Sequence, residues 1–439
     1  MAPNTLQLAC LTTPILTITI LSLPTTSLLR QILYPLPALL FLQALLSPPK
    51  FPSSDNNSIE EAFKLGTLCA SFGFAFCHYL YAHGFHTPKY FNRLKKTTIY
   101  HDDINREDVR YAKEEYPGTL WGRIEWSLSL ITALRGIGWN FQISNLPDTT
   151  YPPSKRSCIL QTIGTIILAH TAWFTSGAIC GFLARLLRDP GYAARYPLFY
   201  TVFANLGVQM AVVSGAWGIR NIVFTVLVSS YLKVLFVGFG NGEEGGWGDF
   251  RMWPRMFGYF EDCWSVKNVW GKVWHQSIRK CIQVPGDKMA NLIFGKNPKL
   301  LSKPIQQLRH IFLLFSAFSI SGLIHVSGSY FIVVGTDYTQ PPPTTNSPPW
   351  YYTFLFFISQ AAFITIEEIV IWILGVSNDG EVVKKSWVRW GVGVGYTTVW
   401  FILCTPVLWA DPESRVVGFF PIGKEGEGYA HVFDRIDRF

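Results

Sequence analysis

The chain has 439 residues, of which 15% are charged and 49% hydrophobic, and its formal net charge is +8. Ordinary soluble domains carry about 25% charged residues, so this composition excludes a protein built only of ordinary soluble domains. The positive charge is ordinary for a membrane protein with basic cytosolic loops, and we expect no nucleic-acid partner.

Uncharged apolar runs recur along the whole chain. A bilayer core of about 30 Å takes roughly 20 apolar helical residues, and residues 157–184, 311–336 and 390–410 contain no Lys, Arg, Asp or Glu. We predict an all-α, polytopic integral membrane protein with about ten spans (eight to ten) plus interfacial amphipathic helices. The predicted spans cover residues 6–23, 28–46, 62–82, 119–137, 158–184, 197–216, 217–240, 310–335, 350–376 and 390–409.

Three of these segments depend on local features. The N-terminal block 1–61 lacks a basic start, so it is predicted as uncleaved spans and not as a signal peptide. The segment 119–137 contains Arg123 and Glu125, so an interfacial helix is its alternative. The block 197–240 makes two spans only if the chain turns sharply near Gly215–Gly218.

Basic residues give the expected orientation. Segments 83–118, 185–196, 241–309 and 377–389 are rich in Lys and Arg, whereas residues 341–350 have none. Ten spans place all the basic segments on one face, which the positive-inside rule identifies as cytosolic. We expect one membrane domain over 1–439, with a cytosolic interfacial insert at 241–309 and a C-terminal tail at 411–439.

The insert combines aromatic and basic residues, as segments at a membrane–water interface do. Between Val266 and Cys281 the apolar residues recur with helical spacing, and a polar stripe faces the other way. That polar stripe consists of Asn268, Lys272, His275 and Arg279. The pattern predicts an amphipathic helix at the cytosolic interface.

His325 is the best-marked reactive residue. It lies about 22 Å along a span that begins near His310, past the midplane, where an ionisable group is costly and is usually functional. Small residues surround it, including Ser321 and Gly328, and they permit close helix packing or leave room for a ligand. A buried imidazole shielded from acid stays neutral, as a general base requires.

Two other groups of residues are candidates. His275 lies on one predicted helix face with the cations Lys272 and Arg279, a face suited to phosphates or to a thioester carbonyl; a solvated basic face is the alternative. The adjacent carboxylates Glu367 and Glu368 point about 100° apart on a helix, and structural pairing is favoured over catalysis.

Together these features resemble the wax synthase-like branch of the membrane-bound O-acyltransferases. The resemblance covers residues 65–410, the wax synthase-like acyltransferase region. The motifs that carry it are Arg135-Gly-Ile-Gly-Trp-Asn-Phe141, Asn268-Val-Trp-Gly-Lys-Val-Trp-His-Gln276 and Ser321-Gly-Leu-Ile-His325. The first motif is similar to filamentous-fungal members that acetylate terpenoid or meroterpenoid alcohols.

The resemblance implies an acyl-CoA-dependent O-acyltransferase of the endoplasmic reticulum membrane, most of all an acetyltransferase acting on a terpenoid alcohol. It implies no bound cofactor and no metal; acyl-CoA, with acetyl-CoA favoured by the resemblance, is the co-substrate and an apolar alcohol the acceptor. His325 becomes the catalytic base. His275 becomes the second catalytic residue, although the family often has Asn there, so Gln276 is an alternative. The implied substrate-binding residues are Trp270, Lys272, Trp274, Gln276, Arg279, Arg135, Trp139, Asn140 and Ser321.

Two other functions stay open from the sequence. A wax ester or sterol acyltransferase would use long-chain acyl-CoA and the same residues. A membrane transporter would also have many spans and intramembrane ionisable residues, but transporters often show internal repeats, and we find none here.

Overall fold

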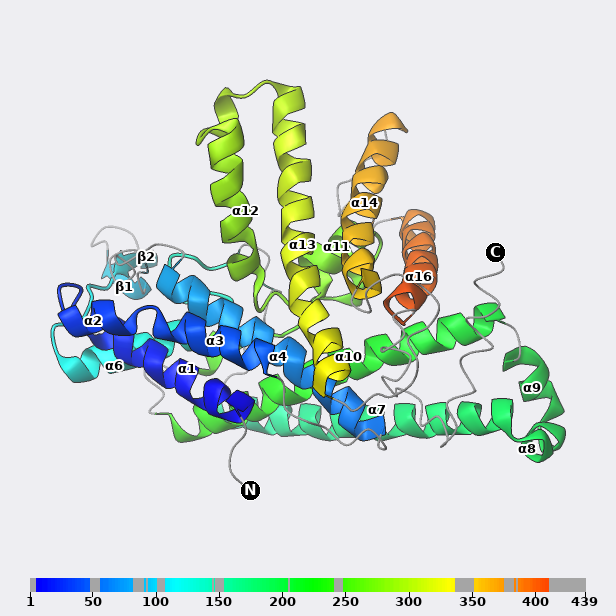
Figure 1. Cartoon of the computed structure of the whole chain (residues 1–439). Coiled ribbons are helices and arrows are strands. Elements are labelled where there is room, and N and C mark those ends of the chain that lie inside the picture. Colours follow the sequence, from blue (N-terminus) through cyan, green and yellow to red (C-terminus); the bar gives the residue numbers. More distant parts are fainter. Residues whose placement is uncertain are drawn as a thin grey trace.

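The computed structural model describes residues 5–47, 56–81, 91, 94–100, 107–143, 146, 154–203, 206–240, 248–335, 351–374, 383 and 386–409. Helices dominate these residues, as the apolar runs predict (Figure 1). The predicted C-terminal tail, 411–439, lies outside the described residues.

The N-terminal helices pack into one group. It contains α1 (Thr5–Ser22), α2 (Leu28–Leu33), α3 (Leu36–Leu46), α4 (Asn56–Tyr81) and α6 (Leu120–Thr132). Their shared core is aromatic, with Tyr79 and Trp126 almost fully buried. At 13 residues, α6 is about 20 Å long, too short to cross a bilayer core, so the predicted span at 119–137 is wrong.

Two strands lie among the helices of the described residues. Strands β1 (Leu94–Tyr100) and β2 (Glu107–Lys113) pair antiparallel, from Leu94 opposite Lys113 to Tyr100 opposite Glu107. The sequence analysis did not predict this hairpin. β-branched and aromatic residues favour strands, and Thr97-Thr-Ile-Tyr100 supplies four in succession.

The middle of the chain forms a long helical pair. Helices α7 (Lys155–Arg188) and α10 (Leu206–Phe239) pack along each other and lie across the upright helices in Figure 1. The short helices α8 (Pro190–Arg195) and α9 (Pro197–Phe203) connect them. The predicted turn near Gly215–Gly218 is wrong, because α10 continues through it; a helix tolerates glycine at a modest cost.

The C-terminal half carries the upright helices. They are α12 (Arg279–Phe294), α13 (Lys303–Gly335), α14 (Tyr351–Ile373) and α16 (Trp387–Trp409). Short helical turns precede α12 or connect it to α13: η2 (Phe250–Met252), η3 (Phe260–Asp262), α11 (Val266–Asn268), η4 (Val269–Val273) and η5 (Pro298–Leu300).

Close packing fixes α13 against α4 and α14. A Cβ atom added to Gly66 of α4 would lie 2.6 Å from the carbonyl oxygen of Ser327, and the Ser327 hydroxyl donates to the Gly66 carbonyl at 3.0 Å. On the other side of α13, a Cβ at Gly322 would meet Phe354 and Phe357 of α14. Small residues therefore let both neighbours approach the helix that carries His325.

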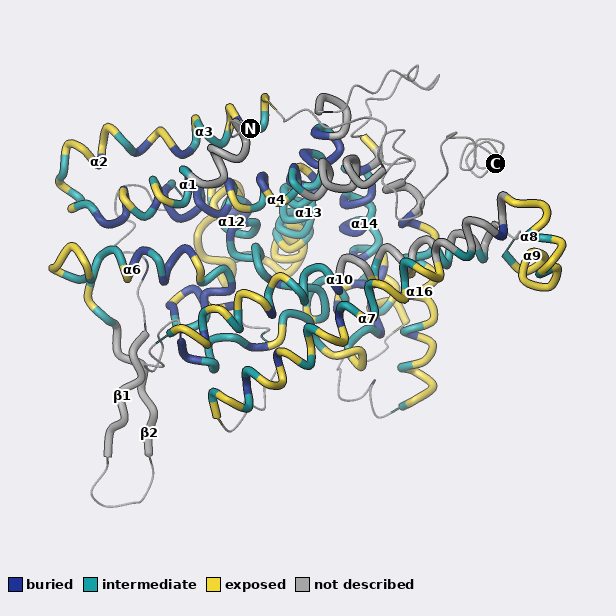
Figure 2. Tube along the Cα trace, turned by 90° about the horizontal axis from the view of Figure 1, so that it is seen from below, coloured by how far each residue is buried: buried dark blue, intermediate teal, exposed yellow. Residues whose placement is uncertain are grey.

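Five helical segments in the described part of the chain are long and apolar enough to cross a membrane: 28–46, 155–179, 222–239, 303–331 and 353–373. The expected count of about ten spans is not confirmed. Exposed positions recur along several of these helices (Figure 2). Large apolar side chains such as Leu168 and Trp372 occupy such positions, as in helices that face lipid.

Candidate active site

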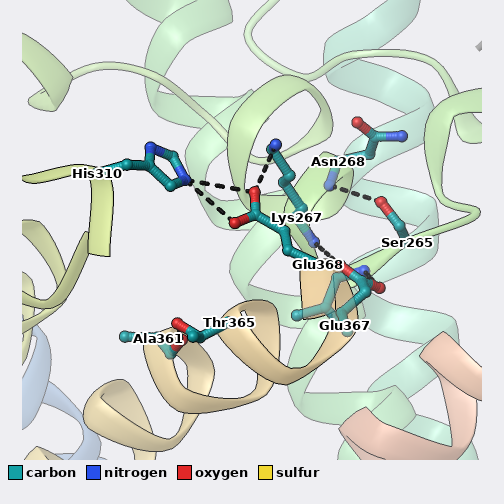
Figure 3. Close-up of polar contacts among 9 residues, drawn as sticks. Ser265, Lys267, Asn268, His310, Ala361, Thr365, Glu367 and Glu368 are labelled. Atoms are coloured by element: carbon teal, nitrogen blue, oxygen red, sulfur yellow. Dashed lines mark hydrogen bonds and ion pairs between the residues drawn. The ribbon is translucent and has the colours of Figure 1, made fainter. Parts of the chain in front are cut away.

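The insert joins the upright helices at a buried carboxylate. Glu367 of α14 is 6% exposed, and its two oxygens accept from the backbone N–H groups of Val266 and Lys267 at 3.0 and 3.1 Å (Figure 3). The Tyr396 hydroxyl donates to the same carboxylate. The first N–H groups of a helix have no partner within it, so Glu367 satisfies those that begin α11.

The neighbouring carboxylate completes this junction. Glu368 accepts from the Lys267 ammonium at 2.6 Å and lies 3.2 Å from Nε2 of His310 at the start of α13 (Figure 3). The junction therefore connects the insert, α13 and α14. Both carboxylates are engaged in structural contacts, in agreement with the interpretation that the sequence favoured.

Beyond the junction the insert descends between the helices. The Trp270 indole donates to Oε1 of Gln360 at 3.2 Å, and its ring centroid lies 5.6 Å from that of Phe318. Gln360 is eight residues from Glu368 on α14, and Phe318 is eight residues from His310 on α13. Each helix thus places Trp270 about 12 Å below the junction. The segment is re-entrant.

The predicted amphipathic helix over Val266–Cys281 is therefore wrong. After α11 the chain makes a single π-helical stretch, η4, becomes extended at Trp274 and resumes a helix at Arg279. We call residues 266–276 the re-entrant turn. Irregular backbone at membrane depth is tolerated where protein satisfies its polar groups, and here two side chains do so: Gln276 and Arg279 donate to its carbonyl oxygens.

His275 lies at the end of the re-entrant turn. Its ring packs against Phe257 and Trp274, and its Nδ1 atom is buried without a hydrogen-bond partner. Burial, with smaller contributions from His325 and Arg135, lowers the pKa of His275 to about 4. The imidazole is therefore neutral at physiological pH, and it lies within electrostatic reach of His325.

His325 has a defined tautomer. Its Nδ1 atom lies 2.8 Å from the carbonyl oxygen of Ser321, and because a carbonyl only accepts, Nδ1 must carry the proton. The Nε2 atom then has the free lone pair that a general base needs. One face of the ring is covered by Phe357, whose centroid lies 4.3 Å away.

An aromatic cluster surrounds Trp270 next to this base. Its ring contacts Trp274, Phe318, Phe357 and Phe401. Gln360, which is fully buried, accepts from the indoles of both Trp270 and Trp400. Gln360 and Phe357 were missed by the sequence analysis, since one uncharged amide and one Phe in an apolar span give no distinctive signal.

The Arg135–Phe141 motif supports the site from outside. The Arg135 guanidinium donates to the carbonyl oxygens of Pro254 and Arg255 at 2.9 and 2.6 Å. Gly136 and Gly138 have positive φ angles of 65° and 75°, which residues other than glycine rarely adopt. The motif is therefore a tight turn that contacts the insert. Its Arg makes the contact, and its glycines permit the positive φ angles.

The other predicted site residues are dispersed. Trp139 is 1% exposed in the N-terminal core, beside Trp126 and Phe141. Asn140 and Lys272 are exposed. The structure thus gathers His275, His325, Trp270, Trp274, Gln276, Arg279 and Ser321 around one region and brings Arg135 near it. Within the described residues, no group of three or more His, Cys, Asp or Glu could hold a metal ion.

Comparison with known proteins agrees with this arrangement. The profile of the Membrane bound O-acyl transferase family matches residues 253–358, a range that contains both histidines. An acetyltransferase from Arthrobotrys oligospora is 38% identical over 98% of this chain and 86% of its own length. An O-mevalon transferase from Aspergillus niger is 28% identical over 88% and 80%, and an acetyltransferase from Rhodocybe pseudopiperita is 26% identical over 69% and 71%. No solved structure matches the chain.

Proposed function

The chain belongs to the membrane-bound O-acyltransferase family and is an O-acyltransferase of secondary metabolism, and from this premise we propose that it transfers an acetyl group from acetyl-CoA to a hydroxyl of a terpenoid or meroterpenoid. The observation that carries the proposal is the pair of histidines: His325 with a free Nε2 and His275 with an unpartnered Nδ1. Family membership removes the transporter alternative.

In the proposed reaction Nε2 of His325 takes the proton from the acceptor hydroxyl as its oxygen attacks the thioester carbonyl. A C–O bond forms and the C–S bond breaks. The proton then passes to the departing CoA sulfur, so the products are the ester and free CoA thiol. No acyl-enzyme is formed.

We assign His275 the second catalytic role. In the tautomer protonated at Nδ1, a neutral imidazole donates one hydrogen bond to the thioester oxygen and stabilises its developing negative charge. The lowered pKa of His275 supports a neutral donor. Gln276 is the poorer candidate, because its amide is already hydrogen-bonded within the re-entrant turn.

The aromatic surroundings support a short acyl group and a water-poor site. Phe357 covers one face of the His325 ring, and Trp270 packs behind Phe357. Exclusion of water protects a thioester from hydrolysis. Two relatives named as acetyltransferases support acetyl as the transferred group, whereas the long-chain wax or sterol alternative needs more room beside the base.

The proposal also includes the topology: one membrane domain in the endoplasmic reticulum, with the insert on the cytosolic side where acyl-CoA is present. The basic residues of the insert support this side. A cysteine introduced at exposed Lys299 should react with a membrane-impermeant maleimide in sealed microsomes. Protection of that cysteine until detergent is added would reverse the orientation.

The experiment for the function is an acyl-transfer assay on the purified full-length enzyme. Labelled acetyl-CoA is offered with terpenoid alcohols, sterols and long-chain alcohols, and the same acceptors are offered with palmitoyl-CoA. The proposal expects acetyl esters of a terpenoid alcohol. Preferential formation of palmitoyl esters of sterols or fatty alcohols would replace it with the long-chain alternative.

A further inference from the structure

Gln276 is the most fully hydrogen-bonded side chain of the re-entrant turn. Its Nε2 donates to the carbonyl oxygens of Trp270 and Trp274 at 3.0 and 2.6 Å. Its Oε1 accepts from Nη1 of Arg279 at 2.7 Å. A glutamine amide has two N–H donors, so both are used within the protein, and the residue is only 5% exposed.

Arg279 provides a hydrogen bond to one more carbonyl group of the re-entrant turn. Its Nη1 also donates to the carbonyl oxygen of Gly271 at 2.8 Å. Three carbonyl groups of the turn, those of Trp270, Gly271 and Trp274, therefore accept from just two side chains. A buried carbonyl without a partner is destabilising, and water is scarce between membrane helices, so these contacts hold the turn in one conformation.

His275 depends on that conformation. Its Nδ1 has no hydrogen-bond partner, and its ring is held by packing against Phe257 and Trp274. The backbone is held on both sides of it: the Trp274 carbonyl accepts from the Gln276 amide, and the Gln276 carbonyl accepts from the backbone N–H of Arg279. The position of the imidazole thus follows from the closed turn and from ring packing, without a hydrogen bond to Nδ1.

We infer that Gln276 and Arg279 are positioning residues for acyl transfer: their hydrogen bonds close the re-entrant turn and hold the His275 imidazole towards His325. The inference rests on the proposed function, since that function gives the two histidines their roles. It separates Gln276 from His275, which sequence alone left as alternatives, by giving the amide a place in the protein and the imidazole a place at the substrate.

The test compares Gln276→Ala, Arg279→Ala and the double variant in the full-length enzyme. A misplaced catalytic group costs up to about 100-fold in rate, so we expect kcat to fall about 10- to 100-fold, with KM for acetyl-CoA changed much less. Since both side chains act through one turn, the double variant should be no slower than the slower single variant.

Gln306→Ala is the matched control. The Gln306 amide also donates to a main-chain carbonyl, that of Leu301 at 2.8 Å, but on the exposed start of α13. The Gln306→Ala substitution should leave kcat unchanged. All rates are referred to folded protein, measured by size-exclusion chromatography and thermal unfolding, so that loss of folded enzyme alone does not count.

The pH profile supplies the readout that a merely structural role would not change. The titratable and charged groups that act on His275 are His325 of α13 and Arg135. A loosened turn exposes the His275 imidazole to water. In Gln276→Ala the acid limb of the pH profile of kcat should therefore shift to higher pH, whereas in Gln306→Ala it should stay at the wild-type pH.

Three results would overturn the inference. They are full kcat in folded Gln276→Ala, a loss confined to KM for acetyl-CoA, and multiplied losses in the double variant. A wild-type enzyme without any acyl transfer would overturn the proposed function and this inference together. An active wild type with any of the three results would overturn only the positioning role.

Discussion

Nδ1 of His325 and the carbonyl oxygen of Ser321, one turn earlier on α13, lie 2.8 Å apart. This contact fixes the protonated nitrogen of the imidazole without using a carboxylate. It leaves Nε2 free for the proposed role of base in a region of apolar side chains, where a charged carboxylate would be costly. The helix backbone thereby does the orienting work that an acidic residue does in other histidine-dependent sites.

Because Glu367 caps α11, we expect alanine variants of the two adjacent carboxylates to differ clearly in stability. Glu367→Ala leaves the N–H groups of Val266 and Lys267 without their acceptor, at about 1–3 kcal/mol for a buried group. Glu368→Ala removes a partly exposed ion pair, worth about 0–1 kcal/mol. Thermal unfolding in detergent should show a clearly lower midpoint for Glu367→Ala. Equal midpoints would mean that the cap does not hold the insert.

The pH dependence of stability has a sign set by His275. Its pKa falls from 6.5 to about 4 on folding, so the unfolded chain takes up a proton at a higher pH than the folded one. The contribution of neutral His275 to the free energy of unfolding is fully present above pH 6.5 and is lost as pH falls towards 4. We expect the unfolding midpoint to drop over this window, and less steeply in His275→Phe. Parallel curves for the two proteins would assign the pH dependence to other groups.

Phe357 predicts the acyl-chain preference. Its ring covers His325 at 4.3 Å, so Phe357→Ala should open space for longer acyl groups. The rate with octanoyl-CoA relative to acetyl-CoA should rise at least about tenfold, since a methylene in an apolar pocket is worth at least that factor. Phe363→Ala is the control, because Phe363 lies on the same helix but stacks on Trp400. An unchanged ratio in Phe357→Ala would place the acyl chain elsewhere.

Hydrophobic runs were sufficient to predict most of the long helices. Helices α7, α13, α14 and α16 lie close to the predicted spans 158–184, 310–335, 350–376 and 390–409, because length and the absence of charge are properties of the local sequence. The unbroken α10 was missed, since glycine residues signal a turn only when the flanking residues do not continue the helix. The segment of α6 was predicted as a span, with an interfacial helix as the alternative, because Arg123 and Glu125 lie within an otherwise apolar window.

The candidate site could be predicted only in part. His325 was found because an ionisable residue in an apolar span is conspicuous. The closure of the re-entrant turn was not, because it depends on where the Gln276 amide and the Arg279 guanidinium reach once Trp270 docks on Gln360. The sequence from Val266 to Cys281 has the periodicity of a helix, and tertiary hydrogen bonds override it.

The most direct test of the account is acyl transfer by His325→Ala beside His170→Ala. His170 has the same backbone contact, Nδ1 to the Ile166 carbonyl at 2.9 Å, but lies on α7 and faces Tyr231. A general base contributes about 10²- to 10⁴-fold, so His325→Ala should lose at least 100-fold in kcat while His170→Ala keeps wild-type activity. Wild-type kcat in folded His325→Ala would contradict the central claim.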